Sequence, residues 1–293
     1  MFKLGIISDE ISPDFEEACR YISEWGLTHV ELRTMWGQNV MQLSEPQLDE
    51  LGQIIDKYQL TVSAIASPVF KSPRSGEAVD VAGDFQVEGY ETFEAQLDLV
   101  RQAAVLCKRF GTDKIRVFTF WREAWTDEVV DDIADKMIEA TRLAKALNVV
   151  LAVENEPVCM VGNGAEMARL FEAIHKKLTP DLKPHIGILW DPGNASDGGR
   201  EVPFPDGYNA IKAYDIVHVH LKDGILDEDG NRTRVPMGQG VVNYIGQLQQ
   251  LEKDAYKGVL ILEPHYRPEG KSIREAAYAC VQAAKEHLHA AFA

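Results

Sequence analysis

Short runs of apolar and β-branched residues alternate along this chain with longer segments in which apolar residues recur every three or four positions. The short runs are typical of buried strands, and the longer segments are typical of amphipathic helices. Eight strands are predicted, at Lys3–Ile7, Thr28–Leu32, Leu60–Ala66, Lys114–Phe120, Val149–Val153, His185–Trp190, Ile216–Leu221 and Gly258–Leu262. Strands that alternate with helices in this way indicate βαβ units and a parallel sheet.

The intervening segments have helical spacing and helical start signals. One of them has apolar residues spaced by four, three, four and three, at Phe93, Leu97, Val100, Ala104 and Cys107. This pattern predicts a helix that lies on a barrel wall. Ser44 with Gln47 and Ser272 with Glu275 have the spacing of a capping box. The last helix is predicted from Ser272 to about His289.

Eight strand–helix units predict a (β/α)8 barrel, the TIM barrel, as a single domain over residues 1–293. The chain length matches one such barrel, and no linker-like tract divides it. A doubly wound open sheet also alternates strands and helices. That fold usually has a glycine-rich phosphate loop after the first strand, whereas Ser8–Glu10 here is acidic and lacks glycine.

Composition narrows the class of protein. A formal net charge of −16 disfavours nucleic acid as a partner, since phosphate backbones are neutralised by Lys and Arg. Four scattered cysteines, Cys19, Cys107, Cys159 and Cys280, have neither metal-ligand nor disulfide-framework spacing, so reduced thiols are expected. Met1–Lys3 leads directly into a strand-like run and no apolar run could span a bilayer, so a cytoplasmic protein without membrane association is expected.

Four consecutive predicted strands end in an ionisable residue, namely Glu154, Asp191, His220 and Glu263. The carboxyl ends of parallel barrel strands meet at one mouth, where buried charges need a partner, and a metal ion supplies one. Three carboxylates and one imidazole suit Mn²⁺, Mg²⁺ or Co²⁺ better than a metal that prefers thiolates, and zinc is also compatible with this set. Taken alone, Asp191 before a proline is equally typical of a turn.

The period of two along a strand puts three further residues on the same faces as these candidates. They are Glu156 with Glu154, His218 with His220 and His265 with Glu263. His220 is the preferred ligand because it is nearer the carboxyl end of its strand. His218 is expected one layer deeper, in the core or behind the metal ligand.

At these residues the sequence resembles the sugar-phosphate isomerase/epimerase superfamily, the xylose-isomerase-like barrels. The superfamily includes ketose 3-epimerases, hydroxypyruvate isomerases, inosose dehydratases and the endonuclease IV type of repair enzyme. The resemblance extends over nearly the whole chain. The matching motifs are Val153-Glu154-Asn155, Trp190-Asp191-Pro192-Gly193-Asn194, His218-Val219-His220-Leu221-Lys222-Asp223, Met237-Gly238-Gln239-Gly240 and Leu262-Glu263-Pro264-His265.

The resemblance implies one divalent metal per chain, held by the four strand-end residues, with Glu154 and Glu263 as the catalytic acid and base. A metal that chelates a carbonyl and the neighbouring hydroxyl acidifies the C–H between them and stabilises an enediolate. Return of the proton gives epimerisation or isomerisation, and loss of a β-hydroxyl gives dehydration. One departure is Asn194, where family epimerases typically have histidine, and this weakens the assignment to 3-epimerisation specifically.

Candidate substrate contacts come from other strand ends and from the neighbours of the metal ligands. They are Asn194, Glu156, Lys222, Trp121, Arg33 and His265, with Glu31, Arg122, Arg267, Trp36 and Trp125 as further candidates. The basic side chains suit a phosphate or carboxylate, and the tryptophans suit a sugar face. Surface, capping or packing roles are the alternative for each.

The function predicted is a metal-dependent isomerase or epimerase of a small keto-sugar or polyhydroxy carbonyl compound. A dehydratase of a keto-polyol is the alternative, and a non-catalytic metal-binding barrel is a third interpretation. The endonuclease interpretation is disfavoured because two strands end in Ser67-Pro68 and Phe120-Trp121, without the extra metal ligands it needs. The exact substrate, its phosphorylation and the oligomeric state stay open, and a homo-oligomer is compatible with the sequence.

Overall fold

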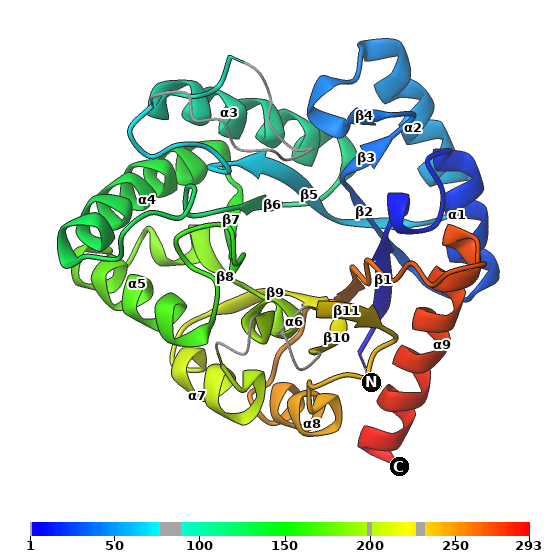
Figure 1. Cartoon of the computed structure of the whole chain (residues 1–293). Helices are drawn as coiled ribbons and strands as arrows, with labels where there is room; N and C mark the ends of the chain where they lie inside the picture. The colour runs from blue at the N-terminus through cyan, green and yellow to red at the C-terminus, as the bar shows by residue number, and fades with distance from the viewer. Residues whose placement is uncertain (1, 77–88, 198–200, 227–231) are drawn as a thin grey trace.

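The computed structural model describes residues 2–76, 89–197, 201–226 and 232–293, and they form a closed barrel of eight parallel strands (Figure 1). Around the barrel the strands follow the order β1–β12–β9–β8–β7–β6–β5–β2. Their bounds are β1 Leu4–Ile7, β2 His29–Leu32, β5 Thr61–Val69, β6 Lys114–Val117, β7 Val150–Glu154, β8 Ile186–Trp190, β9 Ile216–Leu221 and β12 Leu260–Leu262. The fold is therefore the predicted TIM barrel.

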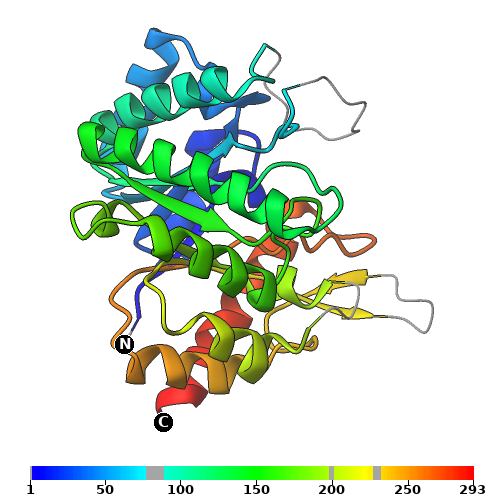
Figure 2. The same ribbon diagram turned by 90° about the vertical axis from the view of Figure 1, so that its left-hand side faces the viewer.

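Helices form the outer layer, and they connect successive barrel strands (Figures 1 and 2). The long helices are α1 Phe15–Glu24, α2 Glu45–Lys57, α3 Phe93–Phe110, α4 Asp127–Leu147, α5 Gly164–Lys177, α8 Tyr244–Lys253 and α9 Ile273–Phe292. Two one-turn helices, α6 Pro192–Ala195 and α7 Tyr208–Ile211, lie between β8 and β9. Both predicted capping boxes are present, at the starts of α2 and α9.

The eight predicted strands are confirmed, with shifts at their ends. Strand β5 continues to Val69, and β6 ends at Val117, three residues before the predicted end. Phe120 has a φ of 63°, a left-handed conformation that no strand contains. The chain therefore turns away at the mouth of the barrel, which brings Trp121 into a bridge with Cys159.

Two short antiparallel pairs were not predicted. Strands β3 Thr34–Met35 and β4 Gln38–Asn39 follow β2, and strands β10 Asp223–Leu226 and β11 Arg232–Val235 follow β9. Both pairs extend the carboxyl-terminal mouth, and Figure 2 shows the β10–β11 pair projecting from that end in yellow. The least regular stretches of the sequence, Pro68–Phe85, Asp191–Gly207 and Asp223–Val241, each follow a predicted strand and are therefore candidate active-site loops. Their residues 77–85, 198–200 and 227–231 lie outside the described residues.

Most buried side chains are apolar, but the barrel also buries charged and polar residues of its strands, such as Glu31, Arg116 and His218. Trp190 is fully buried, and its indole Nε1 donates to Gln247 Oε1 at 3.0 Å. This hydrogen bond pairs the N–H group, the polar group of the tryptophan side chain. All four cysteines are buried and form no disulfide. Among the described residues, no helix combines the length and the apolarity that a membrane span requires.

Packing around Gly187 in β8 leaves no room for a side chain. A Cβ there would lie 2.4 Å from Val217 Cγ1 and 2.8 Å from the carbonyl oxygen of Asp215. Gly187→Ala is therefore expected to lower the free energy of unfolding by about 1–3 kcal/mol, as overpacking does. Denaturant titration of the purified variant measures this change.

Gly52→Ala on α2 is the matched control, because a Cβ there would approach only Phe110, at 3.9 Å. It is expected to leave the stability unchanged or to raise it by up to about 1 kcal/mol, through helix propensity. Equal stability of the Gly187 variant and wild type would contradict this account of the barrel packing.

Candidate metal centre

Four side chains converge at the carboxyl-terminal mouth of the barrel. Glu154 is the last residue of β7, Asp191 directly follows β8, His220 lies in β9 and Glu263 directly follows β12. These four strands are neighbours in the barrel, and all four side chains are buried. One ligand atom from each residue can be chosen so that the four atoms lie within 4.8 Å of one another. The structure thus brings together the four residues that the sequence predicted as metal ligands.

Local hydrogen bonds orient Asp191. Its backbone N–H donates to Asn155 Oδ1 at 2.9 Å, and its carbonyl oxygen accepts from Asn155 Nδ2 at 2.8 Å. Its side chain caps α6, since Oδ1 accepts from the backbone N–H of Asn194 at 2.9 Å. A Cβ at Gly193 would lie 2.4 Å from the carbonyl oxygen of Lys222, so only glycine lets α6 approach β9 this closely.

The donor set fits a divalent cation. Glu154 Oε2 and Asp191 Oδ2 are buried and accept no hydrogen bond from any described residue. Asp191 Oδ2 lies 3.0 Å from Lys222 Nζ, and Glu154 Oε2 lies 3.5 Å from Arg116 Nη1, so both oxygens already have a cation nearby. A metal ion would supply further positive charge to these buried carboxylates. Oxygen ligands with one imidazole are the combination that Mn²⁺, Mg²⁺ and Zn²⁺ accept.

Three basic side chains also touch this group. Lys222 Nζ lies 2.6 Å from Glu263 Oε2 and 3.0 Å from Asp191 Oδ2. Arg116 Nη1 lies 3.4 Å from Glu263 Oε1 and 3.5 Å from Glu154 Oε2, and Arg33 Nη1 donates to Glu263 Oε1 at 2.6 Å. The site is therefore an ion-pair network rather than an isolated acidic cluster.

A charge count over this network favours one divalent cation. It contains six carboxylates and four cations: Asp9, Glu10, Glu31, Glu154, Asp191 and Glu263 against Arg33, Arg116, Lys222 and Arg267. With neutral histidines, as metal ligation requires of His220, two negative charges remain. One M²⁺ ion would neutralise them.

Ionisation of the site follows from burial and from these neighbours. Burial, together with Glu154 and Glu263, raises the pKa of Asp191 to about 6 in spite of Lys222. Burial opposes charge on Glu263 as well, but Lys222 and the nearby histidines hold its pKa well below the usual range. Burial also opposes charge on His220, but Glu31 and Glu154 raise its pKa well above that of free histidine.

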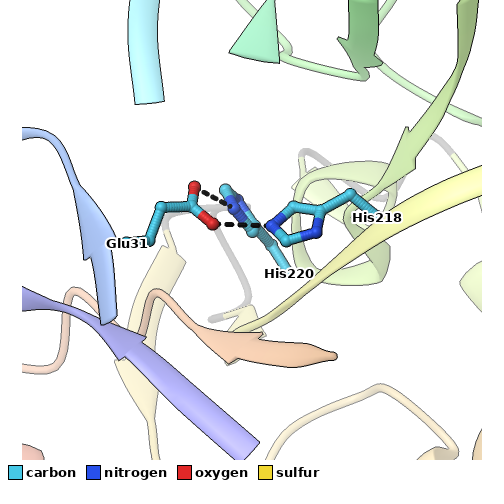
Figure 3. A group of neighbouring side chains, drawn as sticks. All are labelled: Glu31, His218 and His220. Carbon is cyan, nitrogen blue, oxygen red and sulfur yellow. Dashed lines mark hydrogen bonds and ion pairs between the residues drawn. The ribbon is translucent and has the colours of Figure 1, made fainter. Parts of the chain in front are cut away.

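The two ring nitrogens of His220 face different groups. Nδ1 points into the candidate centre, 3.2 Å from Glu154 Oε1 and 3.6 Å from Glu263 Oε2. Nε2 points away from it, to Glu31 Oε1 at 2.9 Å (Figure 3). His218 belongs to this lower group, where its Nε2 lies 2.6 Å from Glu31 Oε2. His218 thus lies behind the candidate ligands, as expected.

Two predicted substrate contacts are already engaged with protein. Asn194 is buried, and its Nδ2 donates to the carbonyl oxygen of Asn155 at 2.8 Å. Arg33 is buried among Asp9, Glu10 and Glu263, with contacts of 2.6–2.9 Å. A substrate could reach either side chain only if these contacts were broken.

Other predicted contacts lie at the rim of the site. Glu156 is half-buried and pairs with Lys71 Nζ at 3.3 Å, and this ammonium lies 5.9 Å from the ring of Trp121. The indole Nε1 of Trp121 is buried without a hydrogen-bond partner among the described residues. His265 is 38% exposed, and its Nδ1 pairs with Glu10 Oε1 at 2.9 Å.

The remaining candidates serve the protein itself. Arg122 binds Glu166 and the carbonyl oxygens of Pro157 and Met160, which fixes the loop after β7. Arg267 pairs with Glu10 at 3.1 Å. Trp36 packs against Phe15, and Trp125 is an exposed hydrophobic residue.

Two residues of the site were not predicted from the sequence: Arg116 in β6 and Glu10 after β1, which enter the ion-pair network. Glu31 in β2 was a candidate substrate contact, but in the structure it contacts both histidines beneath the candidate metal centre. Arg116 had a signal, because an arginine between Ile115 and Val117 is unusual in a buried strand.

Comparison with known families agrees with this geometry. The family model for the xylose isomerase-like TIM barrel matches residues 19–282. The chain belongs to this family. A curated relative, an uncharacterized protein of Methanocaldococcus jannaschii, is 27% identical over 157 residues. That match covers 53% of this chain and 49% of the relative, so the chain matches about half of that protein's length.

Solved structures share the fold at low identity. The IolI protein with a bound zinc atom is 18% identical, with a TM-score of 0.75 over 99% of each chain. A D-tagatose 3-epimerase-like protein is 18% identical, with a TM-score of 0.72 over 99% of this chain and 98% of the other. The probable 3-DHS dehydratase AsbF from Bacillus anthracis is 19% identical, with a TM-score of 0.67 over 97% and 99%. Proteins described as epimerase-like and as a probable dehydratase thus share this fold, and one of these similar structures holds a zinc atom.

Metal binding by this family member is expected to strengthen as pH rises. Asp191, with its pKa raised to about 6, and His220, with its pKa raised well above the ordinary value, must both lose a proton to bind a cation. Below the pKa of a ligand group, the metal must displace a proton from that group. For each such group, the metal affinity therefore increases about tenfold per pH unit. Zn²⁺ titration against a competing chelator at several values between about pH 6 and 8 measures this, with the chelator's own pH dependence subtracted. An affinity that does not change over this range would contradict the assignment of His220 as a ligand.

Proposed function

We propose that this chain is a divalent-metal-dependent isomerase or epimerase of a small keto-sugar or related polyhydroxy carbonyl compound. Glu154, Asp191, His220 and Glu263 would hold the metal, with Mn²⁺ favoured. The observation that carries the proposal is the buried convergence of these four ligand groups at the mouth of a barrel of this family. The metal supplies polarisation of the substrate carbonyl and its neighbouring hydroxyl, which acidifies the C–H between them.

Glu154 and Glu263 are suited to move that proton. They end β7 and β12, which are the outer strands of the run β7–β8–β9–β12, so the two carboxylates approach the centre from its two sides. One carboxylate would take the proton and the other would return it, through an enediolate of the substrate. Return to the opposite face of the same carbon gives epimerisation, and return to the adjacent carbon gives isomerisation.

The pKa of Glu263 suits a base rather than an acid at the start of the cycle. Lys222 and the nearby histidines keep this carboxylate ionised, since its pKa is held well below the usual range even though it is buried. Glu263 would therefore be unprotonated when substrate binds and could accept the proton. Glu154 is also a carboxylate at the start, so it would take up a proton from solvent and deliver it to the substrate from the other side, and Glu263 would release the proton that it accepted to solvent.

Substrate hydroxyls would be held by the polar groups at the rim. Lys222 is placed to contact an oxygen beside the metal, because its ammonium already bridges two of the ligands. Trp121 has an unpaired indole N–H and an apolar face, and Glu156 and His265 offer hydrogen bonds nearby. These groups match a polyhydroxy compound, which presents many hydroxyls and an apolar C–H face.

The proton-transfer roles predict a loss of exchange. Glu154→Gln and Glu263→Gln are each expected to slow deuterium incorporation at substrate carbon by about 10²–10⁴-fold in D₂O, the contribution of a positioned acid or base. The measurement is mass spectrometry of a panel of ketoses and keto-polyols incubated with Mn²⁺-loaded protein. Glu50→Gln, on the exposed face of α2, is the control and should exchange like wild type.

The products of the same panel separate this proposal from its alternatives. An isomer of unchanged mass, apart from deuterium, supports it. A product lighter by one water would make the chain a dehydratase that uses the same centre. Bound metal with no exchange in any compound, or full exchange in both glutamine variants, would contradict the proposal.

A further inference from the structure

Beneath the candidate metal centre, one carboxylate contacts two imidazoles. Glu31 Oε2 lies 2.6 Å from His218 Nε2, and Glu31 Oε1 lies 2.9 Å from His220 Nε2. Figure 3 shows Glu31 on its own side of the barrel, with the two rings opposite it. All three side chains are fully buried.

These contacts determine where the ring protons lie. Each oxygen of Glu31 faces one imidazole nitrogen at hydrogen-bond distance, so both oxygens are placed to accept from an N–H group. An ionised carboxylate can only accept hydrogen bonds, so the nitrogen facing each oxygen must donate. Nε2 of His220 therefore carries a proton. Nδ1, which faces Glu154, has the free lone pair that a metal ligand needs.

We propose that Glu31 is a positioning residue for the metal centre: it fixes the His220 ring, with its Nδ1 aimed at the metal, and shares its second oxygen with His218. This inference rests on the proposed metal site. Carboxylates that accept from the far nitrogen of a ligating histidine set its tautomer and raise its basicity. Nothing else among the described residues contacts His220 Nε2.

His218 holds the second carboxylate oxygen of Glu31. His218 lines a cavity of about 720 Å³ at the amino-terminal end of the barrel, together with Lys3, His29 and Lys114, whereas Glu31 is not part of this lining. The Nε2 of His218 donates to the oxygen of Glu31 that His220 does not use. Both carboxylate oxygens are thus occupied by imidazole N–H groups, and Glu31 cannot turn away from His220 without losing a buried hydrogen bond.

A second metal between Glu31, His218 and His220 is the alternative use of this trio, since their ligand atoms also lie close together. Nitrogen–oxygen distances of 2.6 and 2.9 Å are those of direct hydrogen bonds. Glu31 and His218 are therefore interpreted as hydrogen-bonded supports of His220 rather than as ligands of a second metal.

Wild-type protein loaded with Zn²⁺ tests the tautomer without any variant. In protein labelled with ¹⁵N at histidine, His220 is expected to show a proton on Nε2 that exchanges slowly with water, and a Nδ1 shift that changes when Zn²⁺ is added. His220→Ala and His218→Ala assign the signals. A proton on Nδ1 of His220 in the zinc-bound protein would overturn the inference.

Substitution of Glu31 tests its contribution to affinity. Glu31→Gln keeps the shape and one acceptor but removes the charge, and it is expected to lower Zn²⁺ affinity by about 10-fold, while Glu31→Leu is expected to lower it by about 100-fold. Ser63→Ala is the matched control: Ser63 Oγ lies 3.1 Å from Glu31 Oε2 and touches neither imidazole. It should bind Zn²⁺ like wild type.

The outcomes separate this inference from the proposed function. If wild type binds no Zn²⁺, the metal centre itself is wrong and the inference falls with it. If wild type binds Zn²⁺ and folded Glu31→Gln binds it equally well, with the Nε2 proton of His220 unchanged, only the inference is overturned. A lower melting temperature with unchanged Zn²⁺ affinity would mean a purely structural role and would also overturn it.

Discussion

Compensation of buried negative charge is the constraint on which the site depends. Carboxylates at the ends of neighbouring parallel strands are forced together, and removing them from water is expensive unless positive charge accompanies them. Lys222, Arg116 and Arg33 provide part of that charge, and the two negative charges that remain in the network when the histidines are neutral indicate that more is needed. Burial opposes charge on Glu263, but Lys222 and the nearby histidines hold its pKa well below the usual range, so the cations that stabilise the buried carboxylates also keep this one ionised.

Most of the fold could be predicted because the barrel strands are buried on both faces and therefore appear as short apolar runs between amphipathic helices. Strand ends were predicted less well. Strand β6 ends at Val117, and the left-handed Phe120 that follows it has no signature in the hydrophobic pattern. The β10–β11 pair was missed for a related reason. Its strands lie outside the barrel and include polar residues such as Arg232 and Arg234, which are equally typical of a loop.

The four candidate ligands could be predicted because each follows or ends an apolar run, which marks the mouth of a barrel. Contacts between residues that are far apart in the sequence could not be predicted. Glu31 and His220 are 189 residues apart in the sequence, and nothing local links them. The same limit applies to Arg33, which was expected to bind substrate. Its surroundings in the fold are three carboxylates, and these were not apparent from its position after a strand.

The central claim is that a metal lies between these four side chains, and anomalous diffraction tests it most directly. Crystals grown with Mn²⁺ would be measured above and below the manganese absorption edge. The account predicts one strong anomalous peak enclosed by Glu154, Asp191, Glu263 and Nδ1 of His220. Absence of a peak there in Mn²⁺-saturated protein, or a peak between Glu31 and His218 instead, would contradict it.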